Sequence, residues 1–532
     1  MKYFLLLFFI LGAPLWAEPQ HIVFTYMGDP STSLTVNWQS APGQSSPVVQ
    51  YDTVSRAGNT EAYRHQATGN ISQIPGLDDR SIYQVSLKNL APATTYYLVV
   101  GNAETGLSSE IKVKTIADDE RAIRFVTGGD MGVSNDTRVL LRHAASYDPD
   151  FAAVGGDIAY ANGRISSVKK WDTWLSYYTE EMVTSDGYAI PVVFAIGNHE
   201  VRGSYNKPKT DAPFYFGLFA QDDEKSYFAR QFGKNFVLFV LDSGHIASHE
   251  SQVDWIKNAF SEYQDVPYKA AIYHVPLFPS HRDFMSHYAD MGRQYWAPLF
   301  DEYGLTVGLE NHDHTFKRSH FIKDGMVMDD GVGTLYLGDG CWGREAREVS
   351  YETRPYLVHS GSIQHFWVVD CTTEKMVYRA VDMDNQIFDI YPQSEAGAEQ
   401  AQKVFDAKDR FLIMPDEVIV VEEAQKENNL WIGGEVTIRV SNPFPYPLTV
   451  DVDAHFNKTN IAYSGVPFHV EQLAPGAEKV FTTSFHFSPE AGAELKEEWV
   501  YLKLNAEYRD PEVEKPLLFR KTHSLKLVRP AE

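Results

Sequence analysis

Between residues 123 and 314, five apolar segments with the pattern of buried strands each run into a polar side chain. Glycines beside several of these side chains allow tight turns and a close approach of the backbone to a ligand. In open α/β sheets, ligands bind beyond the carboxyl ends of the strands. The pattern therefore predicts an α/β domain whose binding site is built at the strand ends by Asp130, Asp157, Asn198, His274 and the pair His312 and His314.

The pair His312 and His314 closes this series, after the apolar run 305–309. Neutral imidazole is the commonest metal ligand in proteins. In an extended segment both side chains would leave the same face, because the side-chain period of a strand is two. The pair would then hold one metal ion or reach two ions side by side, although two histidines capping a strand would give the same pattern.

Each strand end alone has an ordinary explanation. A Gly-Asp after a strand is commonly a turn, Asn198 alone would be a turn residue, and His274 alone would be a core histidine with its hydrogen bonds satisfied. Five successive strand ends with oxygen or imidazole side chains do not fit that explanation. They indicate a metal site.

The motifs at these strand ends resemble those of a known family over roughly residues 121–381. They are Gly-Asp-x-Gly at Gly129, Gly-Asp-x-x-Tyr at Gly156, Gly-Asn-His-Glu at Gly197, the isolated His274, and His-x-His after Asn311. Their order and spacing resemble the purple acid phosphatase branch of the calcineurin-like metallophosphoesterases. The resemblance implies a sandwich of two sheets flanked by helices, with two metal ions at the strand ends.

The resemblance also implies which residue binds which ion. Asp130, Tyr160 and His314 would bind the first metal, Asn198, His274 and His312 the second, and Asp157 would bridge them. Phenolate and carboxylate suit Fe³⁺, whereas an amide oxygen with two imidazoles suits Zn²⁺, Mn²⁺ or Fe²⁺. Two ions about 3.5–4 Å apart clamp the attacking and leaving oxygens of an in-line displacement and supply hydroxide near neutral pH.

His199 follows Asn198, and the resemblance places it beside the phosphate, where it and the bridging Asp157 would be catalytic. His281, or else His287, would help to bind substrate, the alternative being ordinary loop histidines. One position departs from the family: Asn311 stands where glycine is usual. Asn tolerates positive φ better than other side chains, so we expect the turn to survive.

The rest of the chain predicts further domains. Residues 1–17 have the pattern of a signal peptide cleaved after Ala17, with a membrane anchor or buried helix as the alternative. Short alternating strands over 18–117 indicate a fibronectin type III-like β-sandwich, also typical of this family branch. The metallophosphoesterase domain is expected over 118–392, a helical linker over 393–410, and a C-terminal β-sandwich over 411–532.

Composition limits the possible partners. The formal net charge of −24 disfavours binding to nucleic acid and gives no general attraction for an anionic substrate, so positive charge must be supplied locally. No segment after the first 17 residues approaches the roughly 20 apolar residues of a membrane span. The two cysteines, Cys341 and Cys371, leave a disulfide open.

These observations predict a secreted dimetal phosphohydrolase that cleaves phosphate monoesters of small molecules. Two alternatives remain: a phosphodiesterase or nucleotide hydrolase using the same site, and an exported binding protein without turnover. The loops 202–223 and 280–294 would decide between monoesters and diesters.

Overall fold

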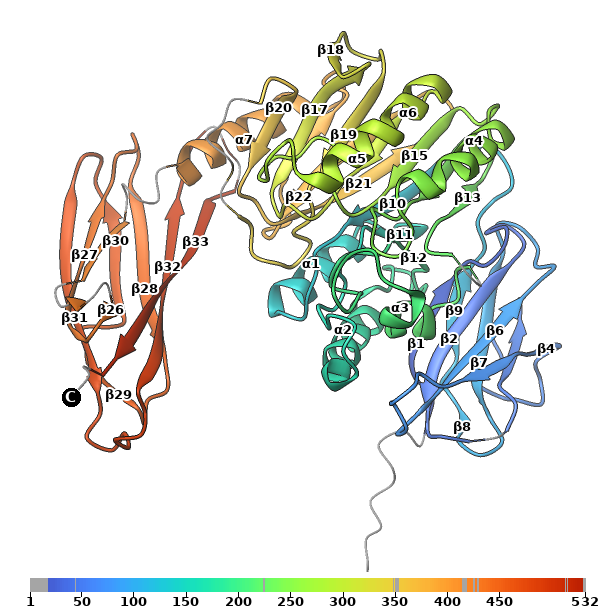
Figure 1. Ribbon diagram of the computed structural model, residues 1–532, viewed down its shortest axis with the longest axis horizontal. Helices are drawn as coiled ribbons and strands as arrows, with labels where there is room; N and C mark the ends of the chain where they lie inside the picture. Colours follow the sequence, from blue (N-terminus) through green and yellow to red (C-terminus); the bar gives the residue numbers. More distant parts are fainter. Residues whose placement is uncertain are drawn as a thin grey trace, which may run out of the picture. The chain divides into compact units, whose positions relative to one another are not determined.

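A computed structural model describes residues 18–529, apart from residues 44, 223–224, 348, 350–353, 414–418, 424–425, 428–429, 512 and 514. The chain divides into two compact units, residues 1–385 and 386–532 (Figure 1). The predicted signal peptide lies outside the described residues. Among the described helices, none is long and apolar enough to cross a lipid bilayer.

The first unit begins with an N-terminal β-sandwich, called the front sandwich below, over residues 20–114. One sheet has the order β1-β2-β6-β5, and the other has β4-β3-β7-β8 with β9 paired to β7. Buried and partly exposed residues alternate over the second part of β6, from Tyr83 to Leu87, as expected for a strand with one face in the core. This confirms the predicted sandwich. Its strands are β1 (Gln20–Thr25), β2 (Leu34–Ser40), β3 (Val48–Asp52), β4 (His65–Thr68), β5 (Asn70–Ser72), β6 (Ser81–Leu87), β7 (Thr95–Asn102), β8 (Gly106–Leu107) and β9 (Ile111–Lys114).

Two sheets form the central domain. The first contains the order β12-β11-β10-β21-β22, in which β10, β11 and β12 are parallel. Its strands are β10 (Ile123–Gly128), β11 (Phe151–Val154), β12 (Val192–Phe194), β21 (His365–Cys371) and β22 (Met376–Asp382).

The second sheet of the central domain has the order β13-β14-β15-β16-β19-β17-β18, with β20 paired to β17. Its members β14, β15 and β16 are parallel. The strands are β13 (Phe228–Phe232), β14 (Phe236–Val240), β15 (Tyr268–Ile272), β16 (Val307–Leu309), β17 (Phe316–Lys323), β18 (Met326–Met328), β19 (Thr334–Gly338) and β20 (Leu357–Gly361).

Aromatic rings join the two sheets face to face. The Phe125 ring of β10 stacks on Phe236 of β14 at 5.0 Å between centroids, and Phe151 of β11 stacks on Phe232 of β13 at 3.8 Å. Helices cover the outer faces (Figure 1), so the predicted two-sheet sandwich is confirmed. They are α1 (Asn135–Ala145), α2 (Val168–Glu181), α3 (Pro213–Leu218), α4 (Val253–Glu262), α5 (His287–Tyr295) and α6 (Ala297–Tyr303), with short 3₁₀ turns at Ile165–Ser167, Lys209–Asp211 and Glu250–Gln252.

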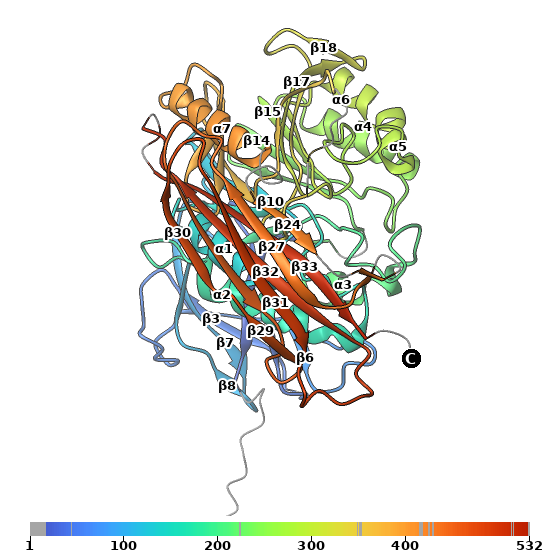
Figure 2. The ribbon, with the colours of Figure 1, turned by 90° about the vertical axis from the view of Figure 1, so that its left-hand side faces the viewer.

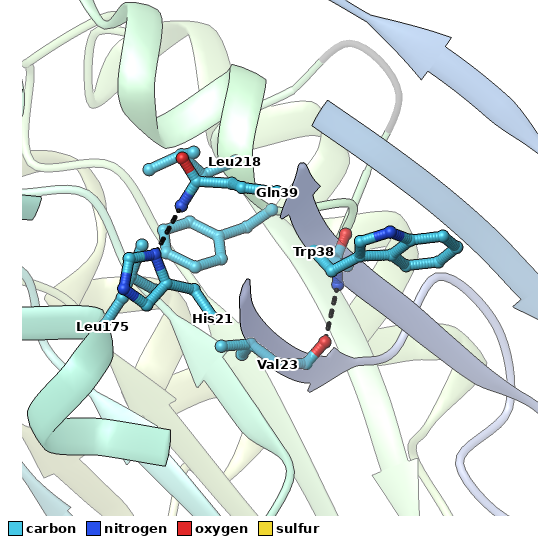
Figure 3. A pocket seen from close by; sticks show the side chains of 8 residues that line it. His21, Val23, Trp38, Gln39, Leu175 and Leu218 are labelled. Atoms are coloured by element: carbon cyan, nitrogen blue, oxygen red, sulfur yellow. Dashed lines mark hydrogen bonds between the residues drawn. The ribbon is translucent and has the colours of Figure 1, made fainter. Parts of the chain in front are cut away.

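The front sandwich is joined to the central domain by polar contacts around a small pocket. Leu175 of α2 and Leu218 of α3 line the pocket together with His21 and Gln39, which contact each other at 3.0 Å between Nδ1 and Nε2 (Figure 3). The His21 Nε2 lies 3.1 Å from Ser176 Oγ of α2. The two domains belong to one compact unit.

The second unit is a β-sandwich of long antiparallel strands, as predicted. Its two sheets have the orders β24-β27-β31-β29 and β25-β26-β33-β32-β28-β30, and β32 and β33 pair along their whole length (Figure 2). The predicted helical linker, 393–410, overlaps α7, but the domain boundaries themselves stay predictions. The elements are β23 (Ile387–Tyr391), α7 (Ala398–Ile413), β24 (Ile419–Glu423), β25 (Lys426–Glu427), β26 (Leu430–Trp431), β27 (Gly434–Ser441), β28 (Leu448–His455), β29 (Ile461–Ser464), β30 (Phe468–Leu473), β31 (Glu478–Phe487), β32 (Glu497–Tyr508) and β33 (Leu517–Val528).

Candidate metal centre

The residues predicted at the strand ends meet at one edge of the central sandwich. The strands β10, β11 and β12 of one sheet and β15 and β16 of the other each end just before one of these residues. Parallel strands bring their carboxyl ends to the same edge of a sheet. As a result, ligand atoms of four residues lie within 4.8 Å of one another: Asp130, Asp157, His274 and His312.

Three side chains form a first group. The Nε2 atom of His314 lies 2.8 Å from Asp130 Oδ1. The hydroxyl of Tyr160 lies 3.0 Å from each of these two atoms and donates to the Asp130 oxygen. Asp130 is fully buried and Tyr160 nearly so. The resemblance assigned these same three residues to the first metal.

Four side chains form a second group around His274. Its Nε2 atom lies 2.9 Å from His312 Nδ1, 3.1 Å from Asn198 Oδ1 and 3.3 Å from Asp157 Oδ2. The other nitrogen, Nδ1, lies 2.9 Å from the Gly155 carbonyl oxygen, which accepts a hydrogen bond. Neutral His274 therefore carries its proton on Nδ1 and directs the lone pair of Nε2 into the group.

The donor atoms of the second group fit a cation. Two imidazole nitrogens, an amide oxygen and a carboxylate oxygen converge, and there are too few protons among them to pair every lone pair. Burial alone would lower the pKa of His274, but Asp157 and Asp130 raise it to about 9. The two buried carboxylates thus draw positive charge to the place where the lone pairs meet. The buried Asp/Asp/His/His cluster indicates a divalent metal site.

Glu200, the last residue of the Gly-Asn-His-Glu motif, holds the backbone beneath this group. Its carboxyl oxygens accept the N–H groups of Asp157 at 2.7 Å, Ile158 at 2.8 Å and Gly197 at 2.9 Å. Burial and the nearby Asp157 raise the pKa of Glu200 to about 8. Glu200 therefore joins the turns after β11 and β12.

Most of the proposed ligands have a left-handed backbone. The φ angles are 54° at Asp130, 52° at Asp157, 57° at Tyr160, 76° at His312 and 56° at His314. Non-glycine residues rarely adopt this conformation, which costs about 1–2 kcal/mol per residue. The strand β16 has already ended at Leu309, so the pair His312 and His314 lies in a turn and each histidine faces a different group.

The chain turns after Asn311, where Asp313 N–H donates to the Asn311 carbonyl oxygen at 3.0 Å, but Asn311 is not the left-handed residue. His312 and His314 take that conformation instead. The Asn311 side chain is buried, donates from Nδ2 to the Tyr273 carbonyl oxygen at 3.0 Å, and packs against Gly129 and Gly155. A Cβ added to Gly129 would lie 2.6 Å from Asn311 Oδ1. The two glycines of the preceding turns thus make room for the side chain at Asn311.

His199 lies beside the second group with its ring partly open to solvent. The side chain is 34% exposed, and Nε2 lies 3.7 Å from Asp157 Oδ2. The Nδ1 atom contacts Asn162 Oδ1, and the ring stacks on Tyr160 with 4.2 Å between centroids. Because Asn162 Oδ1 accepts the proton of Nδ1, the Nε2 of neutral His199 is left with a lone pair facing the site.

The other two predicted histidines, His281 and His287, are not part of the buried Asp/Asp/His/His cluster. His281 is tied to the site through its backbone N–H, which donates to Asp313 Oδ2 at 2.8 Å. His287 begins α5, and its ring packs on Tyr288 at 4.9 Å. Their roles stay predictions.

The structure adds a histidine that sequence reasoning missed. His245 is fully buried, its Nδ1 lies 3.0 Å from the Ser204 carbonyl oxygen, and its ring centroid lies 5.6 Å from that of His274. Burial lowers its pKa to about 3, so His245 is neutral. The sequence did contain a signal for it, because His245 follows the apolar strand β14, which also ends at this edge of the sheet.

Three arginines were also missed: Arg282, Arg344 and Arg347. Arg282 follows β15, and the other two follow β19 after another Gly-Asp turn, at Gly338. The two cysteines left open by the sequence, Cys341 and Cys371, are both free and buried.

Two family profiles match the chain. Residues 19–115 match the family profile of the N-terminal domain of purple acid phosphatase, and residues 123–316 match that of the calcineurin-like phosphoesterases. Purple acid phosphatase 15 of Arabidopsis thaliana is 22% identical over 373 residues, which cover 61% of this chain and 68% of that protein. Purple acid phosphatase 23 of the same plant is 23% identical over 342 residues, covering 58% and 72%.

A solved structure shares the fold. The purple acid phosphatase from yellow lupin (Lupinus luteus) seeds superposes with a TM-score of 0.59 at 18% identity, and covers 70% of this chain and 74% of that chain. Both family matches fall within the first unit, one on the front sandwich and one on the central domain.

Proposed function

Because the chain is a purple acid phosphatase-like protein of the calcineurin-like metallophosphoesterase superfamily, we propose that it hydrolyses phosphate monoesters with two metal ions. That it is a metal-dependent phosphoesterase follows from the family. The number and kind of the ions, the monoester preference and the export of the protein are our proposals. The observation that carries the two-metal proposal is the convergence of seven side chains into two adjoining groups.

In this proposal, Asp130, Tyr160 and His314 hold the first ion, Fe³⁺. Asn198, His274 and His312 would hold the second, which would be Zn²⁺, Mn²⁺ or Fe²⁺, and Asp157 would contribute to both sites. The ions would supply a nucleophile by lowering the pKa of water and would clamp the attacking and leaving oxygens in line. The seven side chains orient the site, and Glu200 keeps the turns that carry Asp157 and Asn198 at a fixed spacing.

His199 is the group that acts on the substrate in this proposal. Its neutral Nε2 faces the site while Asn162 fixes its other nitrogen. Burial lowers the pKa of His199, whereas the nearby Asp157 carboxylate opposes this shift. The ring can hydrogen-bond a phosphoryl oxygen or, once protonated, give a proton to the leaving oxygen. His281 would help to bind the substrate.

Two features weigh on the alternatives. An exported binding protein without turnover would have no need to keep all seven ligand positions filled. A phosphodiesterase would use the same ligands, so the preference between monoesters and diesters must be measured. Export rests on the signal-like residues 1–17.

Asp157→Ala tests the proposal, because one substitution removes a ligand from both ions. We expect metal content, measured by plasma emission spectroscopy, to fall well below two ions per chain. Turnover of p-nitrophenyl phosphate should be lost at the same time. Asp254→Ala, at an exposed position on α4, is the matched control. Normal activity of Asp157→Ala with about two ions bound would contradict the dimetal mechanism, and faster hydrolysis of bis-p-nitrophenyl phosphate by wild type would favour the diester alternative.

A further inference from the structure

Tyr205 lies beside the second group of the candidate metal centre, in the loop that follows the Gly-Asn-His-Glu motif. Its hydroxyl oxygen lies 3.5 Å from Nε2 of His312, a long hydrogen-bond contact. The other nitrogen of the same ring, Nδ1, lies 2.9 Å from His274 Nε2 inside the second group. Within the described part of the chain, Nε2 of His312 has no other hydrogen-bond partner, and neither has the Tyr205 hydroxyl.

The proton of His312 decides what this contact can do. A cation in the second group would need lone pairs on both of the ring nitrogens that face each other. His274 already carries its proton on Nδ1, where the Gly155 carbonyl oxygen accepts it. Neutral His312 must then carry its proton on Nε2, the nitrogen beside Tyr205.

The Tyr205 hydroxyl oxygen is in the right place to accept that proton. A metal-binding histidine usually donates its second ring N–H to an oxygen atom, and this hydrogen bond fixes both the tautomer and the orientation of the ring. A tyrosine hydroxyl can accept such a bond while it keeps its own proton. The contact between Tyr205 and His312 therefore has the chemistry of an outer partner of a metal ligand.

Stacked rings hold Tyr205 in this place. Its ring lies nearly parallel to that of His245, with 4.8 Å between centroids, and to that of Tyr288, with 3.9 Å. His245 is fully buried, and its Nδ1 lies 3.0 Å from the Ser204 carbonyl oxygen. Because packing already fixes the Tyr205 side chain, its hydroxyl needs little further ordering to meet His312.

The backbone of this loop is fixed to the turn after β14. Asn206 N–H donates to the Gly244 carbonyl oxygen at 2.9 Å, and Lys207 N–H donates to the His245 carbonyl oxygen at 3.0 Å. Gly244 has φ +86°, and a Cβ there would lie 2.8 Å from Cε1 of Tyr288. Glycine at this position therefore suits the backbone and leaves the space that the Tyr288 ring occupies.

We propose that Tyr205 is a positioning residue for the second metal ion: its hydroxyl accepts the Nε2 proton of His312 and so keeps the Nδ1 lone pair directed into the second group. The inference rests on the proposed function, in which this group holds an ion. It gives the loop 202–223 a part in metal binding, besides any part in the choice between monoesters and diesters.

Tyr205→Phe tests the proposal, because it removes the hydroxyl and keeps the stacked ring. In the full-length, iron-loaded protein we expect the dissociation constant for Zn²⁺, measured against a fluorescent chelator, to rise about tenfold to a hundredfold, the usual cost of losing a partner of a metal-binding histidine. Iron content should stay at the wild-type level, because His312 is outside the first group. Excess Zn²⁺ should restore turnover of p-nitrophenyl phosphate by mass action, which would not happen if a catalytic group had been lost.

The matched control is Tyr288→Phe. It removes a hydroxyl from the neighbouring ring, which accepts Asn206 Nδ2 at 3.2 Å. This variant should keep the wild-type affinity for Zn²⁺.

A double-variant cycle tests whether the effect passes through His312. With His312→Ala in place, Tyr205→Phe should cause no further loss of zinc affinity, because the hydroxyl has lost its partner. Equal zinc affinities of wild type and Tyr205→Phe, equal losses of iron and zinc, or a further loss in the double variant would overturn the positioning role. If iron-loaded wild type binds zinc but does not hydrolyse p-nitrophenyl phosphate, the proposed function fails, and the zinc affinities still decide the role of Tyr205.

Discussion

At the scale of single residues, Tyr160 connects the proposed first metal with the substrate side of the site. Its hydroxyl lies 3.0 Å from Asp130 Oδ1 and His314 Nε2, and its ring contacts His199 and Arg344. Burial raises the pKa of Tyr160 well above its usual value, and the charges of Asp130 and Asp157 raise it further. Only a strongly charged cation would stabilise the phenolate here.

Tyr160→Phe tests whether that cation is Fe³⁺. Iron-loaded wild type should show a broad visible band from phenolate-to-iron charge transfer. The variant should lack the band yet keep its far-UV circular dichroism, because only a hydroxyl is removed. If iron-loaded wild type has no band, or the variant keeps it, the first ion is not a ferric ion bound by Tyr160.

His199→Ala separates catalysis from metal binding. The side chain adjoins the second group but is not among its converging donors. We expect the variant to keep the wild-type metal content and to lose about 10²–10⁴ in kcat for p-nitrophenyl phosphate, as for a positioned acid or base. Asn162→Ala should lose less, because it frees the ring without removing it. Loss of metal from the His199 variant would mean that His199 is itself a ligand.

At the scale of elements, the site rests on a buried charge network at the start of β17. Lys317 is fully buried and forms two ion pairs. One is with Glu310, which precedes the turn at His312, and the other is with Asp339, which follows β19, at 2.9 Å. Tyr273 at the end of β15 donates to Glu310 Oε1 at 2.8 Å. One lysine therefore joins the ends of four strands beneath the metal ligands.

Lys317→Met should be strongly destabilising. It leaves two buried carboxylates without their cation, and breaking one side of a buried pair costs about 3–5 kcal/mol. The measurement is the urea midpoint of the first unfolding transition, with Lys323→Met at the half-buried end of the same strand as control. Equal midpoints for the two variants would show that Glu310 and Asp339 are neutral or otherwise satisfied without Lys317.

The secondary-structure elements also show how much of the site could be predicted from the sequence. The strands before Asp130, Asp157, Asn198 and His274 were predictable, because apolar runs ending in a ligand leave a local signal. The left-handed turn at His312 and the position of Asn311 were not. They depend on Gly129 and Gly155, which are distant in sequence and supply the space for the Asn311 side chain.

At the scale of the whole molecule, the division into sandwich, central domain and second sandwich was predictable for the same reason. Strand β32 alternates almost perfectly between exposed and buried residues. Such an alternation can be recognised in the sequence without knowing which strand pairs with it. The junction of front and central domains was not predictable. His21 is an ordinary strand residue in the sequence, and its partner Ser176 is 155 residues away. The arginines beside the metal centre could not be predicted for the same reason. Arg282 and Arg347 are distant in sequence and come together only at the His312 carbonyl oxygen.

The left-handed backbone at five of the proposed metal ligands has a consequence for how the sequence of this site would evolve. At Asp130, Asp157, Tyr160, His312 and His314, glycine would suit the backbone better than the residue present. The backbone conformation costs about 1–2 kcal/mol per residue. The chemistry of the site keeps the side chains in place, together with the N–H groups of His312 and His199 that Asp130 and Asp157 accept at 2.7 Å. In a descendant protein that no longer catalyses the reaction, glycine should therefore replace residues at these five positions first. Such substitutions would record the loss of catalysis while the fold is still unchanged.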